Sequence, residues 1–518
     1  MTKPYLWASL TIALLASSTS YAQYAADALR YSEMNQTGSA RFQALGGNHA
    51  SLGGDPSAIH GNPAGLGFYT RSELTISPAV TGISTKTDYL GTGNSDSKAN
   101  VNLAQASLVI ASQPGFQRKW KRSSLGISFS RQQSFQDTYY YSGRNNRSAY
   151  LDNVVENVNR NKTSVAQLEA DFESDPTKGG PVAFSVPAAY YQMYLINPTT
   201  AAGPPYNAVD QSSVVDQAGS YSATGANTQW TLAYAGNLND KFYIGANVGF
   251  SRLRYKYSRT FRDNYIDSPE LISIEQGEDL TVTGSGINLS VGVIYKINPI
   301  FQLGGTIISP TFTAIKETFS QNVNAQYVDN LVTGPDGTLI TPPYSTLPLA
   351  PNDFEYNLVS PLRGNFGATV FLQDKGFITG SIEYADYSMM RAKTSYLSST
   401  DNTNFKNDTK AEIQDTYRSA VNFRLGGEFR ANVFRARVGG AYISDPYLSR
   451  NDGIDRSKLL FSAGVGVRTS RFFADLTGTM TTYKSAFTPY SLNNVQDYSS
   501  VEISNKPVNV MLTLGTFF

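Results

Sequence analysis

Apolar and polar residues alternate strictly in many segments of this chain from residue 72 onward. The clearest segment is 421–430, in which Val421, Phe423, Leu425 and Phe429 alternate with Asn422, Arg424, Glu428 and Arg430. Successive side chains of a β-strand point to opposite faces, so this pattern predicts a strand with one apolar and one polar face. Segments 287–293 and 461–468 repeat the pattern.

Fourteen strands of this kind are predicted along the chain. They lie near 72–85, 100–112, 122–142, 228–236, 241–262, 277–296, 300–318, 354–372, 376–394, 411–430, 433–443, 458–468, 471–484 and 501–518. An even number of alternating strands predicts an all-β fold, a transmembrane antiparallel β-barrel with a polar lumen and a lipid-facing wall. Short connections at 298–299, 373–376, 431–432 and 468–471 are expected to be periplasmic turns, and the longer ones extracellular loops.

The two ends of the chain point to export to an outer membrane. Residues 1–22 combine Lys3, an apolar run and a small-residue ending, which predicts a signal peptide cleaved after Ala22. No later window has enough apolar residues for a membrane-spanning helix. The last strand ends at Phe518, as expected for recognition by the barrel assembly machinery. Outer-membrane lipid and lipopolysaccharide are the other expected partners.

The composition agrees with a barrel and argues against nucleic-acid binding. The chain has 33 Tyr, 27 Phe and 43 Gly, no Cys, and a formal net charge of +1. Aromatic and small polar residues suit strands with one lipid-facing and one wet face. A balanced charge gives no reason to expect nucleic acid as a partner.

The longest predicted extracellular loop, 143–227, contains the unusually apolar stretch 181–196. Two interpretations remain open for it: a loop that packs on itself over the barrel mouth, or an external landing surface for a hydrophobic ligand. The candidate residues of that surface are Phe184, Tyr190, Tyr191, Tyr194 and Leu195.

Residues 23–70 do not alternate, and they are rich in Gly and Ala. Small residues pack closely, and a fourteen-stranded barrel encloses more space than its own side chains fill, so this segment is expected to be a plug inside the lumen. The expected domains are therefore a signal peptide at 1–22, a plug at 23–70 and a barrel at 71–518.

The plug carries Ala44-Leu45-Gly46-Gly47, then Asp55-Pro56-Ser57-Ala58, then Asn62-Pro63-Ala64-Gly65, directly before the first strand. This pattern resembles the FadL/TodX family of outer-membrane transporters for long-chain fatty acids and aromatic hydrocarbons. The resemblance implies a hatch gated by residues Asn62, Pro63, Ala64 and Gly65. It also implies an apolar pocket near the hatch and a sideways exit through a kinked third strand. The candidate strand is 122–142, where Gly126 is either the kink or a small lumen-facing residue.

The sequence therefore favours passive, hatch-gated uptake of hydrophobic small molecules such as long-chain fatty acids, without a cofactor. The alternative is an unselective porin or a structural barrel. An enzyme is not expected, because the only histidines, His49 and His60, both lie in the plug. These two histidines, even with Asp55 nearby, also make a poor set of metal ligands, so no metal site is expected.

A polar network is expected in the lumen. Its candidates are Arg363, Arg424, Glu428, Arg435, Arg437 and Arg468. Two roles remain open for these residues: ion pairs that fix the plug, or a binding site for the carboxylate of a fatty acid.

Overall fold

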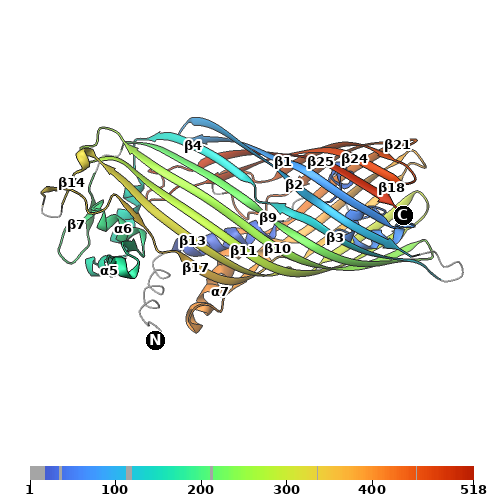
Figure 1. Cartoon of the computed structure of the whole chain (residues 1–518), viewed down its shortest axis with the longest axis horizontal. Helices are drawn as coiled ribbons and strands as arrows, with labels where there is room; N and C mark the ends of the chain where they lie inside the picture. Colours follow the sequence, from blue (N-terminus) through green and yellow to red (C-terminus); the bar gives the residue numbers. More distant parts are fainter. Residues whose placement is uncertain are drawn as a thin grey trace.

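The wall of the molecule is a closed antiparallel β-barrel in a computed structural model that describes residues 18–33, 38–48, 50–112, 119–210, 214–334, 337–450 and 452–518 (Figure 1). Strand β25 (Val501–Phe517) pairs with β1 (Glu73–Tyr89), which closes the ladder. Closure matters because a membrane-spanning sheet has no water to satisfy the backbone groups of a free edge. The predicted fold class and the count of fourteen wall strands are confirmed.

Four wall strands consist of two segments each, so eighteen hydrogen-bonded segments make the fourteen strands, and the nineteenth segment of the sheet, β16 (Thr346–Pro348), lies outside them. Between β1 and β25 the wall contains β2 (Thr92–Ala111), β3 (Trp120–Ser134) continued by β4 (Asp137–Asn145), β9 (Val215–Leu238), β10 (Phe242–Tyr265), β11 (Leu271–Lys296), β12 (Phe301–Ile308) continued by β13 (Phe312–Tyr327), β17 (Asn352–Val359) continuing into β18 (Arg363–Phe371), β19 (Gly376–Asp386) continued by β20 (Arg391–Lys393), β21 (Ser419–Ala431), β22 (Phe434–Ile443), β23 (Lys458–Arg468) and β24 (Phe472–Phe487).

The predicted inside and outside faces are also observed. Phe423 and Leu425 have 49% and 63% of their surface exposed, whereas Asn422 and Glu428 of the same strand are buried. Exposed aliphatic and aromatic side chains recur on every side of the barrel, which is the outer surface expected of a wall in contact with lipid. No helix among the described residues is long and apolar enough to cross a membrane.

Three predicted boundaries are wrong. Residues 399–416, partly assigned to a strand, form helix α7 (Ser399–Thr416), whose N-cap Ser398 accepts a hydrogen bond from Asp401 N. The first hairpin is longer than expected, because β1 and β2 continue to a two-residue turn at Leu90-Gly91. The predicted loop 143–227 shortens to about 146–214, because β4 and β9 pair from Asn145 and Val215 onward.

Connections at the end that carries the C-terminus are short, and we call this the short-turn end (Figure 1). At the opposite, long-loop end, helices and small hairpins cover the mouth. They are α4 (Tyr150–Arg160), α5 (Val165–Ala170), β5 (Phe172–Glu173), η3 (Pro176–Lys178), β6 (Val182–Ala183), α6 (Val186–Gln192), β7 (Ile196–Pro198), β8 (Tyr206–Ala208), η4 (Val328–Asn330), β14 (Val332–Thr333), β15 (Leu339–Ile340) and β16 (Thr346–Pro348), while η5 (Tyr387–Met389) lies between β19 and β20.

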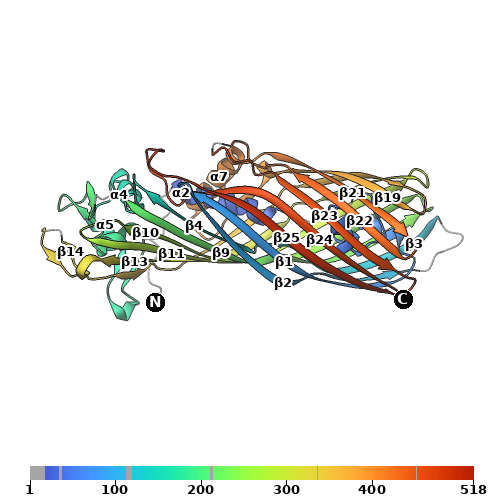
Figure 2. The ribbon, with the colours of Figure 1, turned by 90° about the horizontal axis from the view of Figure 1, so that it is seen from above.

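The described residues of the N-terminal part, from Ser18 to Phe68, lie inside the barrel rather than in its wall (Figures 1 and 2). They form α2 (Ser18–Ser32), α3 (Ala40–Ala44), η1 (Pro56–Ile59) and η2 (Pro63–Phe68). In α2, Tyr24 packs against Phe354 and Phe405, with ring centroids 5.3 and 5.0 Å apart. The remaining elements contact the wall nearer the short-turn end.

Candidate functional site

Residues 38–48 and 50–69, which we call the N-terminal segment, are held against the wall by Asn62. Its side chain is fully buried and caps η2 by accepting a hydrogen bond from Ala64 N at 3.1 Å. Pro63 occupies the first helical position, where its missing N–H costs nothing. Asn62 Nδ2 donates to Val293 O and Gly305 O at 3.2 Å each, and these two residues are partners across β11 and β12. One amide therefore joins the segment to two wall strands.

Glycines of the wall give the segment room to approach. A Cβ added at Gly292 would lie 1.9 Å from Asn62 Oδ1, and one added at Gly439 would lie 2.2 Å from Gly46 N. Similar contacts, under 3.0 Å, would form at Gly126, Gly245, Gly304, Gly426 and Gly464. Real Cβ atoms do not approach so closely, so this part of the wall is shaped to fit the N-terminal segment.

Charged side chains add a second attachment, centred on Glu428 of β21. Its carboxylate pairs with Arg41 of the segment at 3.2 Å, with Arg437 at 2.7 Å and with Arg430 at 2.7 Å. Arg437 also pairs with Asp475 at 2.5 Å, and Arg41 with Asp55 at 3.5 Å. Burial alone would lower the pKa of Arg41, but the carboxylates of Glu428 and Asp55 raise it above its usual value.

The other predicted members of the lumen network have different partners. Arg424 lies 3.8 Å from Glu383, and Arg363 donates to the backbone carbonyl of Ser32 at the end of α2. Arg468 lies over the rings of Phe473 and Phe517, at 5.2 and 4.8 Å from their centroids. Arg435 donates to the backbone carbonyls of Asn432 and Phe434 near a short turn, outside the ion pairs.

The third wall strand is broken, and the break is at Phe135-Gln136 between β3 and β4. Gly126, the suggested kink, instead pairs regularly with Val109 and Ala233 and faces Ile59 of the N-terminal segment. The interpretation of Gly126 as a small lumen-facing residue is therefore the correct one. Pairing between β2 and β3 stops at Gln105 and Ser130. Over the described residues of β2 and β4, no backbone ladder joins the two strands.

Beyond the break, β4 lies against the inner side of the β1–β2 hairpin. Thr85 and Thr87 of β1 donate to the backbone carbonyls of Thr138 and Tyr140, at 2.8 and 2.7 Å. Thr138 Oγ1 in turn donates to Asp96 Oδ2 at 2.6 Å. Side-chain hydrogen bonds thus replace the backbone ladder between β2 and β4 in this part of the wall.

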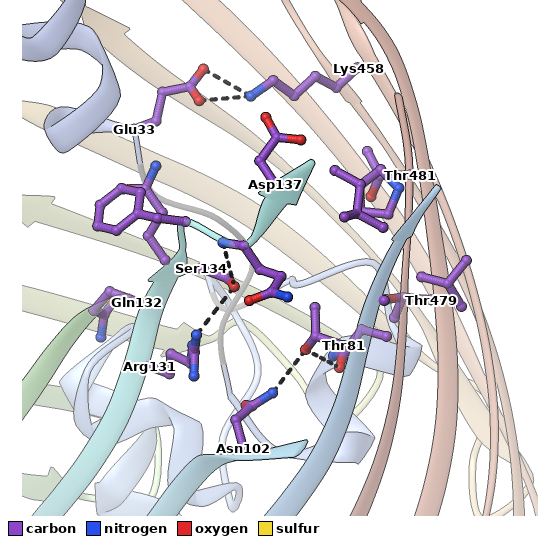
Figure 3. A pocket seen from close by; sticks show the side chains of 18 of the residues that line it. Glu33, Thr81, Asn102, Arg131, Gln132, Ser134, Asp137, Lys458, Thr479 and Thr481 are labelled. Carbon is purple, nitrogen blue, oxygen red and sulfur yellow. Dashed lines mark hydrogen bonds and ion pairs between the residues drawn. The ribbon is translucent and has the colours of Figure 1, made fainter. Parts of the chain in front are cut away.

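A cavity of about 300 Å³ opens at this break, and we call it the wall-break cavity (Figure 3). It is lined by the β3–β4 junction, by α2, by β1 and β2, and by strands β22 to β25, which follow on the other side of β1. Its polar lining residues include Arg30, Glu33, Asn102, Arg131, Asp137, Lys458, Thr479 and Thr481; its apolar ones include Ile83, Phe135, Tyr255, Leu460, Tyr483 and Val508. The resemblance implies an apolar pocket, whereas this cavity is lined by both polar and apolar side chains.

The five candidate residues of the external surface do not share one environment. Tyr190 and Leu195 are fully buried in a core made by α4, α6 and the neighbouring strands, so they lie outside any external surface. Tyr190 Oη accepts a hydrogen bond from Gln276 at 2.6 Å, which fixes the loop to β11. Tyr191 and Tyr194 are half-buried, and Phe184 is 38% exposed. A landing surface on the remaining three residues stays a prediction.

His60 ends η1 and is buried against the wall, whereas His49 lies outside the described residues. Within the described ranges, no group of three His, Cys, Asp or Glu side chains could hold a metal ion.

Sequence patterns did not indicate the contribution of α2, which packs among aromatic side chains in the lumen. Tyr31 packs edge-on against Phe135 beside the break, with centroids 6.0 Å apart. Burial raises the pKa of Asp27 on the same helix, although the paired Arg30 opposes this. The sequence is compatible with a helix over residues 24–31, but it does not show which side chains of the barrel this helix would contact.

Comparisons with known proteins find relatives in fold only. No family model and no curated protein matches the chain. A FadL homologue from Pseudomonas aeruginosa superposes with a TM-score of 0.54 and 13% identity, over 93% of this chain and 99% of that one. The toluene transporter TodX of Pseudomonas putida gives a TM-score of 0.51 and 12% identity, over 94% and 100%. The predicted resemblance is confirmed, and the chain has the fourteen-stranded barrel fold of the FadL/TodX outer-membrane proteins.

Proposed function

We propose that this protein is an outer-membrane channel for passive uptake of hydrophobic small molecules, such as long-chain fatty acids, and that the N-terminal segment is its hatch. The observation that carries the proposal is the break at Phe135-Gln136, where the wall ladder stops beside the wall-break cavity. A hydrophobic molecule that enters this cavity has a short path sideways into the membrane, where its transfer from water is favourable.

The hatch explains why such a path would not be an open pore. Asn62, Arg41 and the wall glycines hold the N-terminal segment across the lumen near the short-turn end. A segment fixed in this way blocks the passage of water and ions along the barrel axis, but it does not cover the break in the wall. A small shift of the segment would need no nucleotide or metal.

Localisation and partners follow from the same proposal. Cleavage after Ala22 would release the mature chain, with its apolar outer surface in contact with lipid and lipopolysaccharide. Phe518 is exposed, and its backbone exchanges hydrogen bonds with Ser72 at 3.0 and 3.1 Å, next to the seam that closes the barrel. A terminal residue at the seam fits a signal for the barrel assembly machinery.

Uptake and conductance together test the proposal against an unselective porin or a structural barrel. Cells that carry the protein should accumulate a radiolabelled long-chain fatty acid or an aromatic hydrocarbon faster than cells without it, and the purified protein should show little current in planar bilayers. A large basal current would favour the porin. Absence of both current and uptake would favour the structural barrel.

A further inference from the structure

Asp137 is the first residue of β4 after the break, and its carboxylate projects into the wall-break cavity between Glu33 and Thr481 (Figure 3). Oδ1 accepts a hydrogen bond from Thr138 N at 2.8 Å. None of the ion pairs formed by the described residues includes Asp137. The cavity therefore presents a carboxylate whose second oxygen has no cationic partner.

The cations that line the cavity are already engaged. Arg30 pairs with Asp27, and Lys458 holds both oxygens of Glu33 at 2.9 and 2.8 Å. Arg131 Nη2 donates to Gly225 O at 3.0 Å and to Ser134 Oγ at 3.3 Å. A ligand carboxylate would compete with these acceptors and would also be repelled by Asp137.

A pure hydrocarbon would fit the cavity poorly for a different reason. It would displace water from Asp137 without replacing the lost hydrogen bonds, and a desolvated charge without partners is costly. Gln132 and Gln133 also line the cavity, and their buried side-chain oxygens are two further acceptors with no hydrogen-bond partner among the described residues. A molecule with a hydroxyl or amine group could donate to Asp137 while its apolar part packs on Phe135, Tyr255 and Tyr483.

We propose that the wall-break cavity binds hydrophobic molecules that carry a hydrogen-bond donor, namely an alcohol, a phenol or an amine, and that Asp137 selects them. This inference rests on the proposed uptake function and narrows its substrate class. It ranks such donors above the long-chain fatty acids and unsubstituted hydrocarbons named for the proposed function, which should still pass through the cavity but bind there more weakly.

The test measures binding of three probes of one shape, 2-naphthol, naphthalene and 2-naphthoate, to the full-length protein in nanodiscs by equilibrium dialysis. Protein-free nanodiscs correct for partition into lipid. We expect 2-naphthol to bind about 3- to 10-fold more tightly than naphthalene, the ratio that one additional hydrogen bond provides. 2-Naphthoate should bind more weakly than 2-naphthol.

Two variants assign the preference to Asp137. Asp137→Leu should bring the ratio of 2-naphthol to naphthalene affinity close to one, and Asp137→Asn, which keeps an acceptor, should retain part of it. Asp279→Leu, which removes an exposed carboxylate of β11 outside the cavity, is the matched control and should leave the ratio unchanged. Heat-dependent gel mobility verifies that each variant forms the barrel.

The outcomes separate this inference from the proposed function. Equal binding of naphthalene and 2-naphthol by the native protein would overturn the inference and leave hydrophobic uptake standing. An unchanged ratio in Asp137→Leu would overturn the role of Asp137. If no probe binds above the lipid background, the inference is wrong, and the uptake and conductance measurements decide the proposed function separately.

Discussion

Arg41 of the N-terminal segment donates from Nε to Glu428 Oε2 of β21 across 3.2 Å, in a place where both side chains are largely buried. This ion pair connects residues 387 positions apart and makes docking of the segment part of the same network as Arg437 and Asp475. Removing one member of a buried network leaves uncompensated charges, which costs more than the pair itself contributes.

Glu428→Gln should therefore loosen the segment and destabilise the protein by roughly 3–5 kcal/mol, because Arg41 and Arg437 would lose the negative charge that compensates theirs. Urea unfolding followed by tryptophan fluorescence measures the loss. Glu355→Gln is the matched control, since its pair with Lys316 is exposed and should contribute less than about 1 kcal/mol. Equal losses in the two variants would contradict the network.

Asn62→Leu should raise the basal conductance of the purified protein while the barrel still assembles. The leucine cannot donate to Val293 O or Gly305 O, and it leaves Ala64 N without its acceptor; a buried donor left unpaired costs about 1–3 kcal/mol. Single-channel recording in planar bilayers measures the effect. Asn407→Leu, on the exposed side of α7, should leave the conductance unchanged. If the conductance of Asn62→Leu stays as low as that of the native protein, the Asn62 amide is not what holds the N-terminal segment in the lumen.

Gly292→Ala tests the close fit between the wall and the N-terminal segment. Its Cβ would collide with Asn62 Oδ1, and relief of such overpacking typically costs about 1–3 kcal/mol. The N-terminal segment should move away from the wall while the β-barrel itself stays intact. The conductance should therefore rise, and the amount of protein at the cell surface should stay normal. Gly364→Ala places its Cβ in open space on a neighbouring part of the wall and should behave like the native protein. If both variants conduct alike, the glycines have another role.

Much of the barrel could be predicted because a lipid-facing strand has to alternate. This period alone predicts Phe423 and Leu425 on the apolar face, and both are exposed. The break at Phe135-Gln136 was less visible: alternation stops in the polar run 131–138, where Phe135 is the one apolar residue, but a polar run does not by itself indicate a broken strand. Helix α7 was mistaken in part for a strand because its polar residues lack a clear apolar stripe.

The sequence drew attention to the N-terminal segment but not to its contacts. The motif around Asn62 indicated a hatch, yet the glycines that receive it are spread over distant strands and form a pattern only in three dimensions. Tyr190 and Leu195 were placed on a candidate surface because an apolar loop is unusual outside a barrel. The loop instead builds its own core, which satisfies the same apolar pattern.

The outward face can be tested with an arginine at Leu425, which should destabilise the barrel by about 2–4 kcal/mol if this position lies near mid-membrane. Ser95→Arg is the control, because Ser95 is equally outward but lies in the part of β2 near the turn of the long first hairpin, among polar residues. Unfolding in lipid vesicles compares the two. Similar free energies of unfolding for the two variants would mean that Leu425 does not lie nearer the middle of the membrane than Ser95.

A reversible cross-link between β2 and β4 tests whether the wall break is the route of uptake. Asp96 Oδ2 and Thr138 Oγ1 are 2.6 Å apart, although no backbone ladder joins their strands over the described residues. The chain contains no cysteine, so Asp96→Cys with Thr138→Cys introduces a single possible disulfide. The oxidised protein holds the β1–β2 hairpin against β4 and should take up a hydrophobic substrate at least several-fold more slowly, with recovery after reduction. Lys316→Cys with Glu355→Cys is the matched control, because these partners already face each other in the β13–β17 ladder. If the oxidised β2–β4 pair transports at the reduced rate, the hairpin does not need to move and the substrate leaves the barrel elsewhere.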